Sequence, residues 1–236
     1  MANKNNSGLW TDSFGGVGAF LSALEKQGVT LAHLSEVRAN QALAQKMAQA
    51  IMSASLKSNS GRKLLQEVLN SPCPFYSGKK KKDTHFAFMG IHVNLLELQN
   101  KFPKEKQPRF YKYSPEAWYS EQGFALSEYC EVKQYLLLRG AIPGSTGLEY
   151  DDQIQLLPAG YQPPLAVEEA LKDMLYYRKY KAFLNPTVWA RTRSFTSDGK
   201  HVSVGSCDSG GLSVYGWYDD DAYSDFGLGA SWDFNS

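Results

Sequence analysis

Two tight-turn signals in the last fifty residues constrain the fold more than any other feature of this chain. The tetrapeptides SDGK (197–200) and DSGG (208–211) each separate runs of residues with high β propensity. Asp198 and Gly199 form the kind of pair that supplies the positive φ angles of a tight hairpin turn. The pattern predicts a small antiparallel meander with strands at 188–196, 200–206, 211–218 and 226–234.

A helix is predicted just before this meander, over residues 165–183. Its apolar residues recur at helical spacing, and Pro186 ends the pattern. We expect the meander to pack on this helix, because each element has an apolar side that it must bury against another. The residues expected on the buried face of the helix are Leu165, Val167, Leu171, Leu175 and Tyr176.

The first seventy residues have helical periodicity. Residues 1–10 are polar and are expected to be disordered. Helices are predicted over 14–27, 31–57 and 61–70. Gly28 is the expected residue after the end of the first helix, and Thr30 is the expected N-cap of the second. Together these signals predict a helical unit over residues 1–72.

The middle of the chain mixes short strand and helix signals. Residues 84–93 alternate in the manner of a strand, and 95–99 are predicted to form a helical turn. A short helix is expected to start at Ser114, with Pro115 at its first helical position. Residues 125–139 fit either period. A helix is predicted there because one face would hold Leu126, Tyr129, Val132, Lys133 and Leu136.

These elements predict an α+β protein with a helical N-terminal unit, a mixed region and a C-terminal antiparallel β-meander packed on a helix. At 236 residues the chain can form one large domain or two small ones. We expect two domains: the helical unit 1–72, and an α+β domain over 84–236 that includes the meander at 188–234.

Charge is divided unevenly along the chain. Residues 1–118 hold 16 Lys and Arg against 8 Asp and Glu, whereas residues 119–236 hold 9 against 16, although the formal net charge is only +1. Such asymmetry bears on partners and solubility. The basic half is expected to meet an anionic partner such as nucleic acid, and the acidic, aromatic sheet is expected to meet protein. Self-association between opposite halves of two copies is a further hypothesis.

Cations and aromatic rings occur together in three segments. Four lysines at 79–82 follow Phe75 and Tyr76, and RFYKY (109–113) and YYRKYKAF (176–183) interleave the two kinds of residue. Single-stranded nucleic acid is bound by this combination, because cations neutralise phosphate while rings stack on bases. A solvated surface segment is the more ordinary explanation. The residues predicted to bind nucleic acid are Lys79, Lys80, Lys81, Lys82, Arg109, Tyr111 and Lys112.

An aspartate-rich segment near the C-terminus offers an alternative function. Divalent cations such as Ca²⁺ and Mg²⁺ prefer several converging carboxylate oxygens. A metal-dependent hydrolase could use Asp219, Asp220, Asp221 and Asp225. The spacing of an EF-hand loop is absent, however, and a charged hairpin tip that keeps a sheet edge soluble explains the segment as well.

Other motifs are weaker. The turn around Gly28 has the shape of a helix-turn-helix, although an ordinary helical hairpin is the commoner explanation. Its base-reading residues would be His33, Ser35, Arg38 and Asn40. No GxSxG, HExxH or Cys–His signature occurs, so catalysis is not favoured and no cofactor is expected.

The cysteine pattern and hydropathy bear on the compartment. Cys73, Cys130 and Cys207 lie far apart and form no CxxC pair, which favours a reducing compartment. The N-terminus lacks the apolar region of a signal peptide, and no run approaches the roughly 18–20 apolar residues of a membrane helix. We predict a cytoplasmic protein without a membrane partner.

Two stretches resemble a known group of sequences. LLLRGAIPGSTGLEYDDQIQLLP (136–158) and RTRSFTSDGKHVSVGSCDSGGLSVYGWYDDD (191–221) are similar to the C-terminal half of uncharacterised small proteins from uncultured bacterial lineages. That group has no assigned activity, so the resemblance implies an intact C-terminal folded unit and no particular site. The function predicted from the residues is therefore a non-enzymatic, cytoplasmic binding or interaction protein.

Overall fold

The computed structural model describes residues 59–102, 105–114 and 116–234, together with Thr30, His33, Glu36, Ala39 and Asn40. Its contacts divide the chain into two units, residues 1–51 and residues 52–236. The predicted helix 14–27, most of the predicted helix 31–57 and Pro115 lie outside the described residues. The predicted domain boundary between residues 72 and 84 stays a prediction.

The described residues of the first unit include a helix cap. The His33 N–H donates to the Thr30 hydroxyl at 3.3 Å, and the Thr30 N–H donates to His33 Nδ1 at 3.1 Å. A threonine hydroxyl that accepts from the N–H three residues later satisfies one of the free donors at a helix start. The prediction of Thr30 as an N-cap is confirmed.

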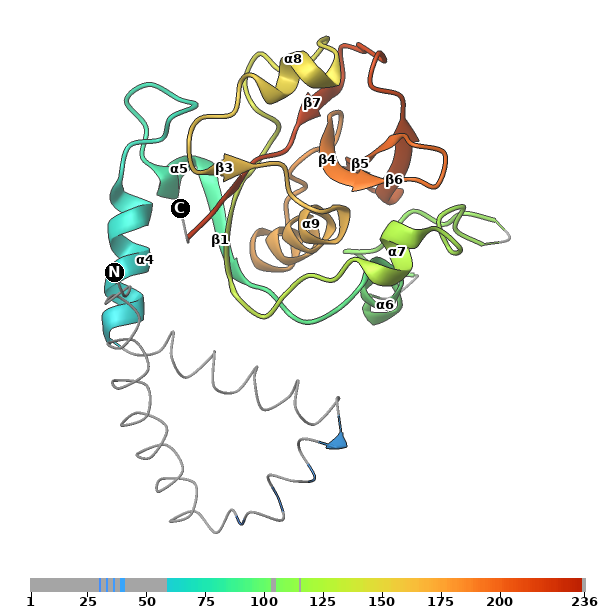
Figure 1. The fold of residues 1–236 in the computed structure, drawn as a ribbon, viewed down its shortest axis with the longest axis horizontal. Coiled ribbons are helices and arrows are strands. Elements are labelled where there is room, and N and C mark those ends of the chain that lie inside the picture. Colours follow the sequence, from blue (N-terminus) through green and yellow to red (C-terminus); the bar gives the residue numbers. More distant parts are fainter. Residues whose placement is uncertain are drawn as a thin grey trace, which may run out of the picture. The chain divides into compact units, whose positions relative to one another are not determined.

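The described part of the second unit contains short helices and two four-stranded sheets (Figure 1). In chain order its elements are α4 (Asn59–Asn70), α5 (Lys81–Thr84), β1 (His85–Met89), α6 (Leu95–Lys101), α7 (Gly123–Ser127), β2 (Gln134–Leu138), α8 (Tyr150–Ile154), β3 (Tyr161–Gln162), α9 (Ala166–Tyr180), β4 (Trp189–Phe195), β5 (His201–Asp208), β6 (Gly211–Trp217), β7 (Phe226–Leu228) and β8 (Ser231–Trp232). The mixed α+β class is confirmed. The predicted helix 61–70, strand 84–93 and helical turn 95–99 correspond to α4, β1 and α6.

The first sheet has the strand order β1-β2-β8-β3, and the second has the order β6-β5-β4-β7. Strands β4, β5 and β6 form the predicted antiparallel hairpins. Gly199, in the first hairpin turn, was predicted to have a positive φ, and its φ is 81°. The prediction that residues 226–234 form the fourth strand of the meander is wrong. Its first part, β7, pairs parallel to β4, and its second part, β8, joins the other sheet.

Helix α9 contacts both sheets, through β1 on one side and β4 and β5 on the other (Figure 1). The predicted helix is confirmed, but the prediction of a single buried face is wrong. Every residue from Ala166 to Met174 is buried, including four charged ones. The helix ends at Tyr180 and is capped by Lys181, which has a left-handed φ of 58° and lies five residues before Pro186.

Two predictions for the middle of the chain are wrong. The predicted helix 125–139 is replaced by the end of α7 and the strand β2, which lies between β1 and β8. Residues 135–138 are all buried, and a central strand covered on both faces is apolar throughout, so its local pattern does not distinguish strand from helix. The helix expected from Ser114 is absent; Trp118–Ser120 form a turn, and α7 begins only at Gly123.

The larger hydrophobic core lies around α9. It joins aromatic side chains of β1 and β2 to the inward-facing valines of β5 and β6. A smaller cluster forms around α8 and β7. No helix in the described ranges is both long and apolar enough to cross a membrane.

Candidate functional site

Strand β6 is one edge strand of the second sheet, and an upstream segment covers part of its edge. The Tyr111 N–H donates to the Leu212 carbonyl at 2.8 Å, and the Leu212 N–H donates to the Arg109 carbonyl at 2.9 Å. An uncovered edge strand exposes a row of N–H and C=O groups that attract other chains. Segment 109–111 thus satisfies the first part of this edge.

Aromatic side chains satisfy the next backbone groups along the edge. The Tyr113 hydroxyl donates to the Val214 carbonyl at 2.9 Å and accepts from the Val214 N–H at 3.1 Å. Trp118 Nε1 donates to the same carbonyl at 2.7 Å. Both rings are held in place by these bonds, and their polar atoms are already used.

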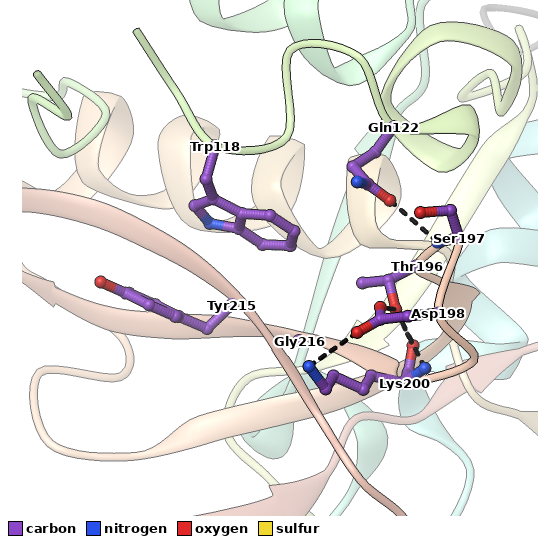
Figure 2. Close-up of a pocket in the computed structure, with 8 residues that line it drawn as sticks. All are labelled: Trp118, Gln122, Thr196, Ser197, Asp198, Lys200, Tyr215 and Gly216. Atoms are coloured by element: carbon purple, nitrogen blue, oxygen red, sulfur yellow. Dashed lines mark hydrogen bonds and ion pairs between the residues drawn. The ribbon is translucent and has the colours of Figure 1, made fainter. Parts of the chain in front are cut away.

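The next edge residue of β6 lines a cavity of about 430 Å³. Because backbone groups on a strand point outward at every second residue, Gly216 follows Leu212 and Val214 in facing the edge. Figure 2 shows the cavity with the aromatic residues on one side and the polar residues of the β4–β5 hairpin on the other. It is lined by Trp118, Gln122, Thr196, Ser197, Asp198, Lys200, Tyr215 and Gly216. We call it the hairpin pocket.

Two rings form the aromatic wall of the hairpin pocket. The centroids of Trp118 and Tyr215 lie 6.3 Å apart with an interplanar angle of 31°. Phe124 packs behind Trp118 at 6.0 Å, and Trp189 packs against Tyr215 at 5.5 Å. Tyr215 remains 41% exposed. The wall is therefore supported from behind and open toward the pocket.

The polar side of the pocket combines hydrogen-bond donors with an acceptor. Gln122 Oε1 accepts from the Ser197 N–H at 2.9 Å, which orients the amide and leaves its NH₂ group for other partners (Figure 2). Asp198 accepts from the Thr196 hydroxyl at 2.6 Å and forms an ion pair with Lys200 Nζ at 2.7 Å. The hydrogen bond from Lys200 lowers the pKa of Asp198, and that same bond raises the pKa of Lys200.

A second cavity, of about 440 Å³, is lined in part by residues between 110 and 120. Its lining is Leu96, Gln99, Asn100, Phe102, Phe110, Tyr111, Lys112, Tyr113, Glu116, Ala117 and Ser120. We call it the helix pocket, because α6 supplies several of these residues. The ring of Tyr113 lies 5.1 Å from Tyr111 and 6.0 Å from Tyr215, so an unbroken series of rings connects the two pockets.

The predicted nucleic-acid residues fall into two groups. Tyr111, which is 45% exposed, and Lys112 line the helix pocket. Arg109 is half-buried and donates from Nη2 to the Ser209 carbonyl at 2.9 Å. Lys81 and Lys82 are the first residues of α5, and Lys79 and Lys80 directly precede it. Figure 1 shows α5 on the opposite side of the unit from α6, so the two groups do not form one strip.

The lysine run contributes to the fold at one position. Lys81 is only 6% exposed, and its Nζ lies 3.4 Å from the ring centroid of Trp232. Burial lowers the pKa of this lysine. Lys79, Lys80 and Lys82 are exposed. One lysine of the run thus makes a buried cation–π contact while its neighbours are exposed to solvent. The sequence alone does not indicate which of the four lysines is buried.

The aspartate-rich segment forms hydrogen bonds with a buried arginine and with a histidine. The Arg191 guanidinium, which is fully buried, donates to the backbone carbonyls of Tyr218 and Asp221. Asp219 Oδ1 lies 2.5 Å from Nδ1 of His201, and the Asp221 carboxylate accepts from the Tyr218 N–H. Asp220 is exposed, and Asp225 accepts from the Trp189 N–H through its carbonyl. Within the described ranges no three His, Cys, Asp or Glu residues form a group that could hold a metal ion.

A charged cluster on α9 was not predicted from the sequence. The side chains of Glu169, Lys172 and Asp173 are fully buried. Lys172 forms ion pairs with both carboxylates and donates to the carbonyls of Leu138 and Arg139 at 3.2 Å. Burial raises the pKa of Glu169 to about 7 and also raises the pKa of Asp173. Burial alone would lower the pKa of Lys172, but the two carboxylates raise it overall. The cluster ties α9 to the end of β2.

Sequence reasoning also missed the hairpin pocket. Its residues come from segments about 75–100 positions apart, and no local motif contains them. The high aromatic content and the SDGK turn were the available signals, but neither indicates that Trp118 and Asp198 share a cavity. No family model, curated protein or solved structure matches the chain, so the geometry of the two pockets carries the functional argument.

Proposed function

We propose that this chain is a non-enzymatic binding protein and that the hairpin pocket holds the ring of a neutral carbohydrate. The observation that carries the proposal is the lining of this cavity. A supported aromatic wall faces a donor amide, an ammonium group and a carboxylate. Its volume of about 430 Å³ lies within the range of about 300–1,000 Å³ that is usual for small-ligand pockets.

The mixture of donors and acceptors favours hydroxyl groups as the recognised feature. A hydroxyl can both donate and accept, so it can bridge an Asp198 oxygen and a Lys200 ammonium or a Gln122 amide. The C–H faces of a sugar ring are apolar and can pack on Trp118 and Tyr215. A ring that carries hydroxyls on its rim and C–H groups on its faces matches both sides of the cavity.

The charge of the lining disfavours a polyanion. In the hairpin pocket Asp198 offsets Lys200, and in the helix pocket Glu116 offsets Lys112. Binding to nucleic acid depends on an excess of cations that neutralise phosphates. We therefore favour a neutral ligand over the nucleic acid that the basic segments predict, and the experiment below distinguishes the two.

The polar atoms of the aromatic side chains already have partners within the protein, which disfavours a proline-rich peptide as the ligand. Aromatic-lined grooves bind such peptides in an extended form, and a proline contributes a carbonyl acceptor but no N–H. Trp118 Nε1 and the Tyr113 hydroxyl already donate to the Val214 carbonyl. Moreover, prolines would leave the Asp198 carboxylate without a donor from the ligand.

The ionisation of the pocket supports binding rather than acid–base catalysis. General acids and bases work best with pKa values near the working pH. The mutual ion pair instead lowers the pKa of Asp198 and raises that of Lys200, so both stay charged near neutral pH. The pair is suited to fixing hydroxyl groups in place.

The proposal is tested by isothermal titration calorimetry with neutral cello-, malto- and chito-oligosaccharides. We expect at least one series to bind saturably, with little change between roughly 50 and 200 mM salt, because no phosphate is neutralised. Tyr215→Ala should weaken binding about tenfold, which corresponds to about 1.4 kcal/mol. Tyr180→Ala is the matched control, because Tyr180 is similarly exposed and lies at the end of α9, outside both pockets.

Two results would contradict the proposal. The first is the absence of binding to all three series at millimolar concentration. The second is tight binding of a single-stranded oligonucleotide that weakens steeply with salt and is abolished by Lys112→Ala. That outcome would restore the nucleic-acid hypothesis at the helix pocket.

A further inference from the structure

We infer that the hairpin pocket and the helix pocket are two subsites for one oligosaccharide, so that the natural ligand is a glycan chain and not a free monosaccharide. The inference rests on the proposed function and specifies its ligand class. It starts from the rings between the cavities. Tyr111, Tyr113 and Tyr215 follow one another with centroid distances of 5.1 and 6.0 Å, and the centroid of Trp118 lies 6.3 Å from that of Tyr215.

Two rings of this series are exposed, one at each pocket. Tyr111 is 45% exposed in the helix pocket and Tyr215 is 41% exposed at the hairpin pocket. Tyr113, between them, is half-buried and turned toward the β6 edge by its two hydrogen bonds to Val214. A ligand that reached both exposed rings would therefore pass over an apolar ring without meeting an unsatisfied polar group of Tyr113.

The helix pocket has the same chemistry as the hairpin pocket. It combines the aromatic side chains of Phe102 and Tyr111 with two amides, Gln99 and Asn100. It also contains a lysine and a glutamate, Lys112 and Glu116, whose charges balance. Two neighbouring cavities with aromatic walls, donors and acceptors, and no net charge are suited to successive residues of one neutral polymer.

One segment held by hydrogen bonds lines both cavities, which fixes their relative position. Ala117 and Ser120 line the helix pocket, whereas Trp118 and Gln122 line the hairpin pocket. The segment is held by the hydrogen bond from Trp118 to Val214 and by turn bonds at Ser120 and Gln122. Because the subsites are already in place, a ligand that binds one is presented to the other at high effective concentration.

The test is the dependence of affinity on chain length in the series that binds. Calorimetry with the monosaccharide, disaccharide, tetrasaccharide and hexasaccharide should show affinity rising with length until both pockets are filled, in total by roughly 100-fold. Tyr111→Ala should remove most of this gain for the hexasaccharide while leaving the monosaccharide unchanged. Tyr215→Ala should weaken every member, and Tyr180→Ala should weaken none.

The failures of the inference and of the proposed function can be told apart. Equal affinity for the monosaccharide and the hexasaccharide would overturn the two-subsite arrangement while leaving carbohydrate binding intact. An unchanged hexasaccharide affinity in Tyr111→Ala would overturn it as well. If no member of any series binds, both ideas fail together. Circular dichroism and thermal unfolding of each variant establish that a lost affinity is not a lost fold.

Discussion

Replacing Lys172 by Met should destabilise this protein more than the loss of an exposed lysine. The ammonium group is fully buried, pairs with Glu169 and Asp173, and donates to two backbone carbonyls at the end of β2. Methionine is unbranched like lysine and leaves little empty space. The substitution therefore isolates the loss of charge and hydrogen bonds from the loss of volume.

The expected magnitude follows from what the substitution leaves behind. Two buried carboxylates lose their cation, and the carbonyls of Leu138 and Arg139 lose a donor. Removing one partner of a buried ion pair typically costs about 3–5 kcal/mol. Since a domain of this size loses about 2–4 °C for each kcal/mol, the melting temperature should fall by roughly 6–20 °C.

The assay is equilibrium unfolding in urea at pH 7, followed by circular dichroism and tryptophan fluorescence. Lys82→Met is the matched control, because Lys82 is exposed and its change should stay within about 0.5 kcal/mol. A loss below about 1 kcal/mol in Lys172→Met would refute the reasoning, since it would mean that the cluster is hydrated or that its carboxylates are protonated at little cost. Adding Glu169→Gln should recover part of the loss, and the double-mutant cycle measures the coupling.

Three further predictions follow from the described residues. Burial raises the pKa of Glu169 to about 7 from its ordinary value of 4.5, so the folded state holds this proton more tightly than the unfolded state. The free energy of unfolding should therefore fall as pH rises from about 5 to 8. In urea titrations of Glu169→Gln, this decrease with pH should disappear. Gly199→Ala should cost about 1 kcal/mol in the same assay, because the residue has a φ of 81°. Lys81→Met should lower stability by about 0.5–2 kcal/mol through its lost contact with Trp232, whereas Lys79→Met should leave the melting curve unchanged.

Half of the regular elements in the described part of the chain could be predicted from local pattern. Helices α4, α6 and α9, strand β1 and the β4–β5–β6 hairpins were all indicated by periodicity or by turn residues. Strand β2 was predicted as a helix because it is short and apolar, so that its class depends on the strands that flank it. Helices α5 and α8 and strand β3 were not predicted, and β7 and β8 were predicted as one strand of the meander. Sequence also indicated Tyr111 and Lys112 as neighbours of a binding surface, but it grouped them with lysines on the opposite side of the unit (Figure 1).

The distribution of charge along the sequence was the poorest guide to the surface of the folded protein. The acidic excess of the second half includes Glu169 and Asp173, which are buried beside Lys172, and Asp219, which pairs with His201. The basic excess of the first half includes Lys81, buried on an indole. Counting charges does not say which of them face solvent. Self-association, a cytoplasmic location and nucleic-acid binding therefore stay predictions.

Local interactions specify the helices and hairpins of this chain, because a periodic apolar stripe or a positive-φ glycine acts over a few neighbouring residues. The partner of each strand, the burial of the α9 charges and the meeting of Trp118 with Tyr215 and Asp198 depend on contacts between segments far apart in sequence. Such contacts form only when the whole unit packs. They depend on the removal of apolar surface from water and on which segments cover the unpaired edge of β6. The helices and hairpins that have a local pattern are thus readable from the amino-acid order, whereas both candidate pockets exist only in the folded chain.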